Sequence, residues 1–545
     1  MQTECLDYRQ LPGLNPLFPE YLYQYDRLES LYSSPVHLSL DALKERAESV
    51  LKNPPPYPRD QLVELTTAFN QRVGAGEKVF QNLEKLRSPR TLAVVTGQQP
   101  GFFGGPALTV YKALTAVRLA QMLDEEGYPA VPVFWLASDD TDFHEVCLTS
   151  FFADNGDLFS VSYQGPKQNG SRMVGTIPLN TVEECFSRLQ KEGPKGEFHE
   201  EVLQMLQETY PPSKSFREAA GSWLSHLFRP YGLILFDALL PEYKQGVGSL
   251  FARAIEKRRE ILQALKGRAE ALQERGFDPQ VRVQDSESFI FWTEGENRYK
   301  LEYGGERYRR KAQDSPKLSA QELLRELDQQ AEKFAPNVLL RPIVQDHLFP
   351  TVAYVGGPSE VAYFAQVSAI SRFWNKEMAV FPRVGITLVD RKAQRLLRKY
   401  GLKVLDVLQL TPQELSRRIV EGKDPEHILE RLEHVQKELQ SELRALKDDI
   451  GKIDPTVAEM LGGAEKKILY QIEKIQKRFV ANHRNQEATF GQHLDYLCSH
   501  LYPNGKLQER VMSFNQFLSE EGPDLVDRLL NVIDPFCPSH QVIYL

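Results

Sequence analysis

Residues 92–146 read LAVVTGQQPGFFGGPALTVYKALTAVRLAQMLDEEGYPAVPVFWLASDDTDFHEV. This stretch gives the clearest prediction of the fold class. The apolar run at 92–95 leads into a turn with four glycines, and a helical pattern covers 107–126. A second apolar run at 131–137 ends in an acidic loop at 138–145. This order predicts a βαβ unit with polar side chains at the carboxyl ends of both strands. Ligands bind at that edge of open α/β sheets, so we expect a functional site there.

The composition is that of an ordinary globular protein with several domains. The chain has 545 residues, of which 41% are hydrophobic and 26% charged, and its formal net charge is −8. This length predicts about two to four domains. The negative charge argues against a nucleic-acid partner, because phosphate binding needs clustered lysine and arginine. The basic run at residues 307–311 is the best candidate for a local phosphate-binding patch, but a solvated strand end explains it more simply.

Cysteine usage and hydropathy predict a cytoplasmic protein without a membrane partner. The five cysteines are scattered, with no CxxC pair and no metal-ligand spacing, which is typical of reduced thiols in a cytosolic chain. The N-terminus MQTECLDYRQ lacks the basic and apolar segments of a signal peptide. No apolar run is long enough to cross a bilayer. We expect no metal held by protein ligands alone.

The remaining sequence extends the sheet and adds packed ends. Short apolar runs at residues 232–237, 338–344 and 351–355 predict further buried strands. Alternating residues at 280–308 predict a β-hairpin. The aromatic N-terminal arm and the apolar segment 535–545 are expected to pack on the core.

From residue 411 onward the sequence becomes more charged and helical. Segments 425–454 and 457–482 each carry a narrow apolar stripe amid dense charge, and Pro455 separates them. A short turn between two helices predicts an antiparallel hairpin. Such a hairpin buries little apolar surface alone, so the stripe predicts a partner surface.

The turn at residues 96–106 combines glycines with amide side chains. Glycine lets a ligand approach the backbone closely, and a helix N-terminus binds anions through its free N–H groups. The sequence is neither GxGxxG nor a Walker A loop, so a tight strand-to-helix turn explains the glycines about equally well. The adjacent amides Gln98 and Gln99 favour a binding role, because they suit hydrogen bonding better than packing.

The loop after the second strand gathers Asp139, Asp140, Asp142, His144 and Glu145. Such a cluster can coordinate a divalent cation, supply a general base or hold an ammonium group. A solvated loop with a helix-capping aspartate is the alternative, since carboxylates favour helix starts. Zinc is disfavoured because no further histidine or cysteine lies nearby with suitable spacing.

A second polar focus follows the predicted strands of the 338–355 region. It contains Gln345, Asp346 and the turn GGPSE at residues 356–360. Amphipathic side chains nearby are Tyr354, Tyr363 and Gln366. Two glycine-rich turns at strand ends in one sheet fit a shared ligand crevice better than two unrelated helix starts.

Four segments resemble the BshC family, the cysteine ligases of bacillithiol biosynthesis. They are TGQQPGFFGGP (96–106), FWLASDDTDFHEV (134–146), LRPIVQDHLFPTVAYVGGPSEVAYFAQ (340–366) and HQVIYL (540–545). The resemblance covers the whole chain, including a helical hairpin in the same late position. These segments are long and unusual, so the resemblance is more specific than any single motif above.

The resemblance implies an α/β fold with a Rossmann-type parallel sheet, similar to the core of class I aminoacyl-tRNA synthetases. Connecting-peptide-like insertions and an α-helical coiled-coil hairpin are added to that core. The implied domains are a core at 1–410 with insertions at about 151–230 and 240–335, a hairpin at 411–495, and a C-terminal segment at 496–545 that packs back on the core. A homodimer through the coiled coil is also implied.

The implied reaction joins the carboxyl group of cysteine to the amine of glucosaminyl malate through an amide bond. A free carboxylate needs activation, so ATP is the expected cofactor, with Mg²⁺ as its potential companion. The chain lacks the HIGH and KMSKS signatures that bind ATP in the synthetases. The turn at 96–106 takes the place of the first and nothing clear replaces the second, so the fold analogy does not establish adenylation.

Three groups of site residues are expected from the motifs and the resemblance together. The catalytic candidates, which would bind an ammonium group or act as the base in an order that spacing leaves open, are Asp140, Asp142 and Glu360. The substrate-binding candidates are Gln98, Gln99, Asp139, His144, Gln345, Tyr354, Tyr363 and Gln366. The cofactor-binding candidates are Thr96, Gly97, Gly101, Gly104, Gly105, Gly356 and Gly357. A non-catalytic dimeric scaffold, a sugar-thiol-binding protein and a nucleotidyltransferase acting on another substrate are the alternative functions.

Overall fold

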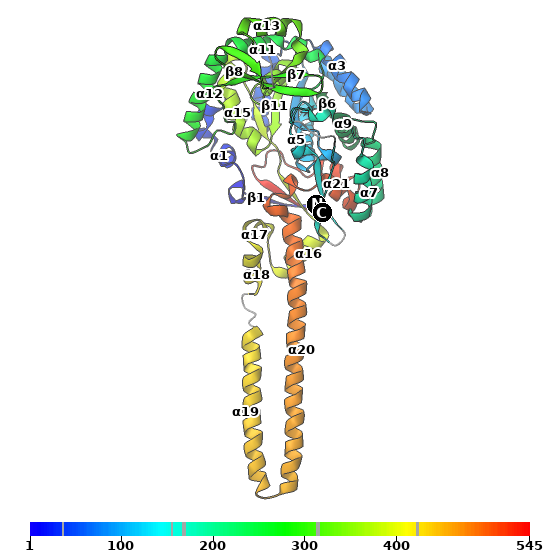
Figure 1. The fold of residues 1–545 in the computed structure, drawn as a ribbon, viewed down its shortest axis with the longest axis vertical. Helices are drawn as coiled ribbons and strands as arrows, with labels where there is room; N and C mark the ends of the chain where they lie inside the picture. Colours follow the sequence, from blue (N-terminus) through cyan, green and yellow to red (C-terminus); the bar gives the residue numbers. More distant parts are fainter. Residues whose placement is uncertain (35–37, 154–155, 166–169, 312–316, 421–424) are drawn as a thin grey trace. The chain divides into compact units, whose positions relative to one another are not determined.

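The chain folds into two compact units (Figure 1). The computed structural model describes residues 1–34, 38–153, 156–165, 170–311, 317–420 and 425–545. The first unit contains residues 1–390 and 503–545, and the second contains residues 391–502. The cavity discussed below lies in the first unit.

A parallel sheet of five strands forms the centre of the first unit. Its strands in spatial order are β12 (Val380–Pro382), β11 (Thr351–Gly356), β2 (Leu92–Gln98), β3 (Ala130–Leu136) and β6 (Ile234–Asp237). Nearly every residue of these strands is buried, as expected for a sheet covered on both faces. The chain proceeds from β2 to β3 and β6 on one side, then to β11 and β12 on the other. The topological switch point therefore lies between β2 and β11.

Two buried helices connect the central strands. Helix α5 (Leu108–Glu125) joins β2 to β3, which confirms the predicted βαβ unit. Helix α15 (Pro358–Ser371) joins β11 to β12. Both helices bury residues on nearly all sides, which is typical of helices inside a domain. Further helices around the core are α1 (Leu17–Tyr23), α2 (Leu40–Lys52), α3 (Arg59–Arg72), α4 (Glu77–Arg87), α21 (Phe514–Glu521) and α22 (Leu525–Leu530).

Two insertions interrupt the central sheet. Between β3 and β6 lie the strands β4 (Leu148–Phe152) and β5 (Leu158–Ser162) and the helices α7 (Val182–Glu192), α8 (His199–Thr209) and α9 (Phe216–Leu227). Between β6 and β11 lie α11 (Gly248–Glu256), α12 (Arg258–Gln273), α13 (Ala320–Gln329) and a sheet of β10 (Phe334–Pro336), β7 (Glu287–Glu294), β8 (Asn297–Gly304) and β9 (Arg307–Arg310). The antiparallel pair β7–β8 confirms the predicted hairpin.

The predicted strand at residues 338–344 is wrong. Most of this run belongs to helix α14 (Arg341–Leu348), which has a proline in its first turn. Proline suits that position because it lacks an N–H group and its φ is already helical. A short apolar run cannot distinguish a strand from a buried helical turn by pattern alone.

Both chain ends belong to one small sheet in the first unit. Strand β1 (Gln2–Leu6) pairs antiparallel with β14 (His540–Tyr544), and β14 pairs in parallel with β13 (Ile386–Val389). Ile543 of β14 belongs to the apolar core, and Tyr8 and Phe18 of the N-terminal arm are buried, so both ends pack on the first unit as predicted.

The second unit contains the predicted helical hairpin. After α16 (Arg391–Tyr400), α17 (Val404–Gln409) and α18 (Pro412–Val420), the long helices α19 (Pro425–Gly451) and α20 (Pro455–Leu501) pack antiparallel (Figure 1). Asp454 caps α20 by accepting hydrogen bonds from the amides of Thr456 (2.9 Å) and Val457 (3.2 Å).

Across the described ranges, no helix has both the length and the apolar character needed to cross a membrane.

Candidate functional site

A cavity of about 650 Å³ lies at the carboxyl ends of the central strands. Its wall includes Gln98 at the end of β2, Asp139 and Asp140 after β3, and Gly357 after β11. Parts of both glycine-containing turns and of the acidic loop therefore line one cavity. It lies at the switch point, where open α/β sheets bind ligands.

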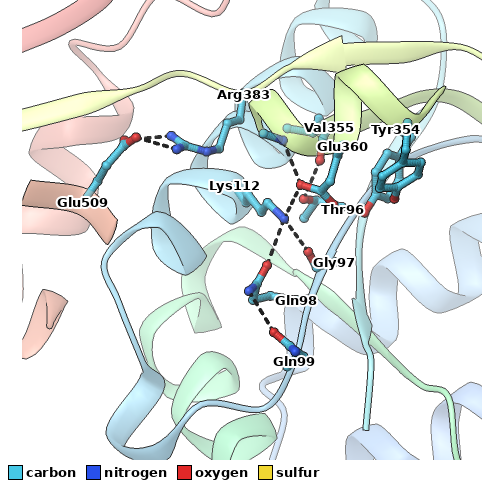
Figure 2. A network of polar contacts seen from close by, with 12 residues as sticks. Thr96, Gly97, Gln98, Gln99, Lys112, Tyr354, Val355, Glu360, Arg383 and Glu509 are labelled. Carbon is cyan, nitrogen blue, oxygen red and sulfur yellow. Dashed lines mark hydrogen bonds and ion pairs between the residues drawn. The ribbon is translucent and has the colours of Figure 1, made fainter. Parts of the chain in front are cut away.

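Lys112 of α5 connects the two turns (Figure 2). Its Nζ donates hydrogen bonds to the carbonyl oxygen of Gly97 (2.8 Å) and to Oε1 of Gln98 (3.0 Å). The same atom forms an ion pair with Oε2 of Glu360 at 2.5 Å. An ammonium group has three N–H donors, and each has an acceptor here. Lys112 therefore positions its neighbours.

Glu360 lies in the first turn of α15 and is held from several sides. Its Oε1 accepts a hydrogen bond from the Tyr354 hydroxyl at 2.5 Å, and its Oε2 accepts one from the Gly357 amide at 2.8 Å. Burial alone would raise the pKa of Glu360, but the Lys112 ammonium and the Gly357 and Tyr354 donors outweigh it and lower the pKa. The N-terminus of a helix also favours a negative charge. Glu360 is therefore ionised.

The acidic side of the cavity lies beyond the end of β3. The Gln99 Nε2 donates hydrogen bonds to Oδ2 of Asp140 (3.0 Å) and to Oε2 of Glu145 (2.8 Å). Arg298 of β8 donates from Nη1 to Oδ2 of Asp139 (2.9 Å), and its Nη2 lies 3.6 Å from Oδ1 of Asp140. The buried Nε of Arg298 has no hydrogen-bond partner among the described residues, so a ligand oxygen would satisfy it.

The basic side of the cavity lies near β11 and β12. Arg341 of α14 lies over the Tyr354 ring, with its Cζ 4.7 Å from the ring centroid, and donates a hydrogen bond to the Tyr363 hydroxyl at 3.2 Å. Arg383, just after β12, forms a two-point ion pair with Glu509 at 2.7 and 2.5 Å. Glu509 also accepts a hydrogen bond from the Ile386 amide at 3.0 Å. This network fixes the direction of the Arg383 guanidinium (Figure 2).

Basic side chains outnumber acidic ones in the cavity wall. The basic residues are Lys112, Arg282, Arg298, Lys300, Arg341, Arg383 and Arg510, and the acidic ones are Asp139, Asp140, Glu145, Glu287 and Glu360. The wall therefore suits a ligand with more than one carboxylate or phosphate group, since such groups form strong hydrogen bonds with guanidinium. In the part of the chain that the structure describes, no three histidine, cysteine or carboxylate side chains form a group suited to a metal ion.

Half of the predicted site residues line the cavity. They are Gly97, Gln98, Gln99, Asp139, Asp140, Tyr354, Gly357, Glu360 and Tyr363. The predicted residues outside the cavity wall are Thr96, Gly101, Gly104, Gly105, Asp142, His144, Gln345, Gly356 and Gln366.

The second half of the first turn packs into the core. Gly104 has a φ of +82°, and a Cβ there would lie 2.4 Å from the Trp223 ring. Its amide donates a hydrogen bond to the Tyr210 hydroxyl at 2.7 Å, and the neighbouring Phe102 and Phe103 are fully buried. Glycine at position 104 therefore allows the turn to pack closely against Trp223.

The remaining residues outside the wall have supporting contacts. Asp142 is exposed and caps the short helix α6 (Phe143–Val146), which matches the helix-capping alternative, and His144 is exposed on that helix. Thr96 donates a hydrogen bond to the carbonyl oxygen of Val355 at 2.9 Å and so joins β2 to β11. Gln345 is fully buried and accepts a hydrogen bond from Arg341 at 3.0 Å.

Gln366 holds a loop beside the cavity. Its amide group accepts a hydrogen bond from the Val281 amide at 2.9 Å and donates one to the Val281 carbonyl oxygen at 2.8 Å. Val281 and its neighbour Arg282 both line the cavity. Gln366 therefore contributes by fixing the backbone that carries Arg282.

Sequence reasoning missed five residues that organise the site. They are Lys112, Arg298, Arg341, Arg383 and Glu509. Lys112 had a detectable signal, because it is a charged residue amid the apolar positions of the helix at 107–126. The other four come from separate parts of the chain and meet only in the folded structure.

Comparison with known proteins identifies two matching family models. The model described as "Bacillithiol biosynthesis BshC, N-terminal Rossmann-like domain" matches residues 1–384, and the model described as "Bacillithiol biosynthesis BshC, C-terminal coiled-coil domain" matches residues 386–545. Together with the five-stranded parallel sheet, these matches confirm the expected α/β fold with a Rossmann-type core and a coiled-coil hairpin.

Several curated relatives match over most of the chain. Two of them, each named "Putative cysteine ligase BshC", come from Koribacter versatilis (strain Ellin345) and Solibacter usitatus (strain Ellin6076), with 32% and 31% identity over 100% of both chains in each comparison. A relative of the same name from Bacillus cytotoxicus is 28% identical over 89% of this chain and 91% of its own.

Among the solved structures that match is one titled as a putative arginyl-tRNA synthetase from Campylobacter jejuni. It has 11% identity, covers 84% of this chain and 99% of its own, and has a TM-score of 0.21. A TM-score this low does not establish a shared fold.

Proposed function

The chain belongs to the BshC family of bacillithiol biosynthesis, and we propose that it is a ligase that joins the cysteine carboxyl group to the amine of glucosaminyl malate. The observation that best supports this proposal is that Asp139 and Asp140 line the cavity beyond β3, whereas Arg341 and Arg383 line it near β11 and β12. The substrates of this reaction carry carboxylates, which match the basic side of the cavity, and amines, which match the acidic side.

The basic side is proposed to bind the carboxylates of the malate group and the phosphates of an activating nucleotide. Arg341 and Arg383 are the main candidates, because each is held in place by the contacts described above while lining the cavity. Guanidinium groups bind carboxylate and phosphate oxygens through paired N–H donors. Lys112 and Glu360 act as positioning residues for this side.

The acidic side is proposed to bind the reacting amine. Asp140 is the best-placed carboxylate, since it lines the cavity and is oriented by Gln99. In the amide-forming step the amine nitrogen attacks the activated acyl carbon. The new C–N bond forms while the bond to the leaving group breaks, and the proton of the amine passes to Asp140.

ATP is proposed as the source of activation. When bound, it would supply an adenylyl or phosphoryl group to the cysteine carboxylate, with pyrophosphate or ADP as the leaving group, and so make the carboxyl carbon reactive toward an amine. The excess of basic side chains in the wall supports a phosphate-bearing ligand. Mg²⁺ would accompany the nucleotide, held chiefly by its phosphates.

A cytoplasmic homodimer is also proposed. Apolar side chains stay exposed along the hairpin of the second unit, and they include Ile428, Val435, Leu446, Val457, Met460, Ile468, Tyr470 and Ile475. A stripe of this kind is stabilised by covering it with a second copy. The five cysteines are scattered along the sequence with no CxxC pair, which is typical of a reducing compartment.

The direct test is to supply the purified protein with cysteine, glucosaminyl malate and ATP. Bacillithiol should form, as measured by mass spectrometry of the labelled thiol. Exchange of labelled pyrophosphate into ATP, dependent on cysteine, would identify an acyl-adenylate as the activated species. Failure to form bacillithiol with every nucleotide and divalent cation would contradict the proposal and favour the scaffold alternative.

A further inference from the structure

Two of the five cysteines meet where the two chain ends come together. Cys5 lies in β1 and Cys537 lies in the segment just before β14, and their sulfur atoms are 3.2 Å apart. Cys5 is exposed and Cys537 is partly exposed, so small molecules in solvent can reach the pair. The two residues are separated by 532 positions in sequence.

Hydrogen bonds on both sides of the pair hold it in place. Strand β1 pairs with β14, with Cys5 opposite Gln541. The Gln541 side chain donates a hydrogen bond to the carbonyl oxygen of Asp534 at 2.7 Å, and Tyr23 donates one to the carbonyl oxygen of Pro538 at 2.7 Å. The segment that carries Cys537 is therefore anchored, and the sulfur contact results from backbone packing.

The sulfur atoms of the pair lie close to bonding distance. A disulfide has a sulfur–sulfur distance of about 2.05 Å, so closing the contact needs a side-chain movement of only about 1 Å. Burial and the hydrogen bond with Cys537 raise the pKa of the Cys5 thiol to about 11. The Cys5 thiol is therefore protonated near neutral pH.

We propose that Cys5 and Cys537 form a reversible disulfide when the protein meets a low-molecular-weight disulfide. The thiolate of one cysteine attacks a sulfur of the small disulfide, forms a mixed disulfide and expels one small thiolate. The second cysteine, as its thiolate, then attacks the protein-bound sulfur, closes the Cys5–Cys537 bond and expels the other small thiolate. The two protein thiols are oxidised, the small disulfide is reduced to two thiols, and the protons pass through solvent.

The bond would tie the first strand of the chain to its last. It would hold together the sheet β1–β14–β13, in which β13 provides the Ile386 amide that bonds to Glu509. Chain ends are otherwise where local unfolding begins. This inference does not depend on the proposed ligase activity.

The test uses the full-length protein and glutathione disulfide as the probe. Thiols are counted after denaturation and alkylation, and peptides are mapped by mass spectrometry. Oxidation should lower the count from five thiols, the total in the sequence, to three, with a peptide pair linked through Cys5 and Cys537. The linked chain should migrate faster on a non-reducing denaturing gel, because the bond closes nearly the whole chain into a loop, and dithiothreitol should reverse the shift.

Three variants control the assignment. Cys5→Ser and Cys537→Ser should each abolish the linked peptide and the gel shift. Cys498→Ser, which changes a partly exposed cysteine of the second unit, should retain both. The proposal is overturned if all five thiols stay reactive, if a glutathione adduct persists on Cys5 or Cys537 without closing, or if the bond joins two copies of the chain.

Discussion

Lys112 and Glu360 form the buried ion pair that joins the two glycine-containing turns. Removing one partner of such a pair leaves the other charge buried and unpaired, which costs about 3 kcal/mol. We expect Lys112→Met to lower the free energy of unfolding by about this amount in urea titrations.

The double variant Lys112→Met with Glu360→Gln is the matched control. It removes the unpaired charge and keeps one oxygen that can accept the hydrogen bond from the Gly357 amide, while the new amide NH2 can donate to the Tyr354 hydroxyl. It should therefore be more stable than the single variant. A double variant that is less stable than Lys112→Met would contradict the ion-pair interpretation.

Asp140 and Asp142 test the acidic side of the cavity. Both are aspartates of one loop, but Asp140 lines the cavity and Asp142 is an exposed helix cap. Asp140→Asn should lower kcat/KM for bacillithiol formation about 10²- to 10⁴-fold, the range of a lost general base. Asp142→Asn should have little effect, because asparagine caps helices as well as aspartate does. Equal losses in both variants would argue against the role of Asp140.

His540 gives the stability of the protein a defined pH dependence. Burial lowers its pKa from 6.5 to about 4, against the opposing charge of Glu509. Between these values the unfolded chain binds a proton that the folded chain does not, so stability falls as the pH drops from about 6.5 to 4. Over this interval, wild type should lose about 3 kcal/mol more than His540→Gln, measured by urea unfolding at each pH. Parallel pH profiles would refute this expectation.

At the scale of elements, the turn before α5 is shaped by packing. Gly104→Ala would force a Cβ against the Trp223 ring at a φ of +82°, so we expect a loss of about 3 kcal/mol or more. Gly127 is the control, because it has a similar φ of +84° and a Cβ added there would meet nothing within 4 Å. Gly127→Ala should cost only about 1 kcal/mol of backbone strain, as judged by the same unfolding experiment. Similar losses at both positions would show that the Trp223 contact is unimportant.

The elements also show where pattern reasoning is reliable. The βαβ unit, the β7–β8 hairpin and the long helical hairpin were predictable, because each shows a periodicity over many residues. The run at 338–344 was too short for this, and the proline near its end favours the first turn of α14.

At the scale of the whole molecule, the exposed apolar side chains of the hairpin predict its role in assembly. Deletion of residues 425–482 should convert a dimer into a monomer, as measured by light scattering. The central sheet belongs to the first unit, so the far-UV circular dichroism of the truncated protein should lose only the helical signal of the deleted residues. A truncated protein that remains dimeric would place the dimer contact elsewhere.

The sequence by itself determined the local architecture and predicted the edge of the sheet at which the cavity lies. The apolar runs, the glycine turn and the acidic loop of residues 92–146 are encoded by neighbours along the chain, and parallel strands bring their carboxyl ends to one edge. Tertiary structure decided which side chains use that edge. Lys112, Arg298, Arg341 and Arg383 come from α5, β8, α14 and the end of β12, and their partners depend on strand register and packing. Packing likewise places Gly104 against Trp223 and directs the Gln366 side chain to Val281, and both partners lie far away in sequence.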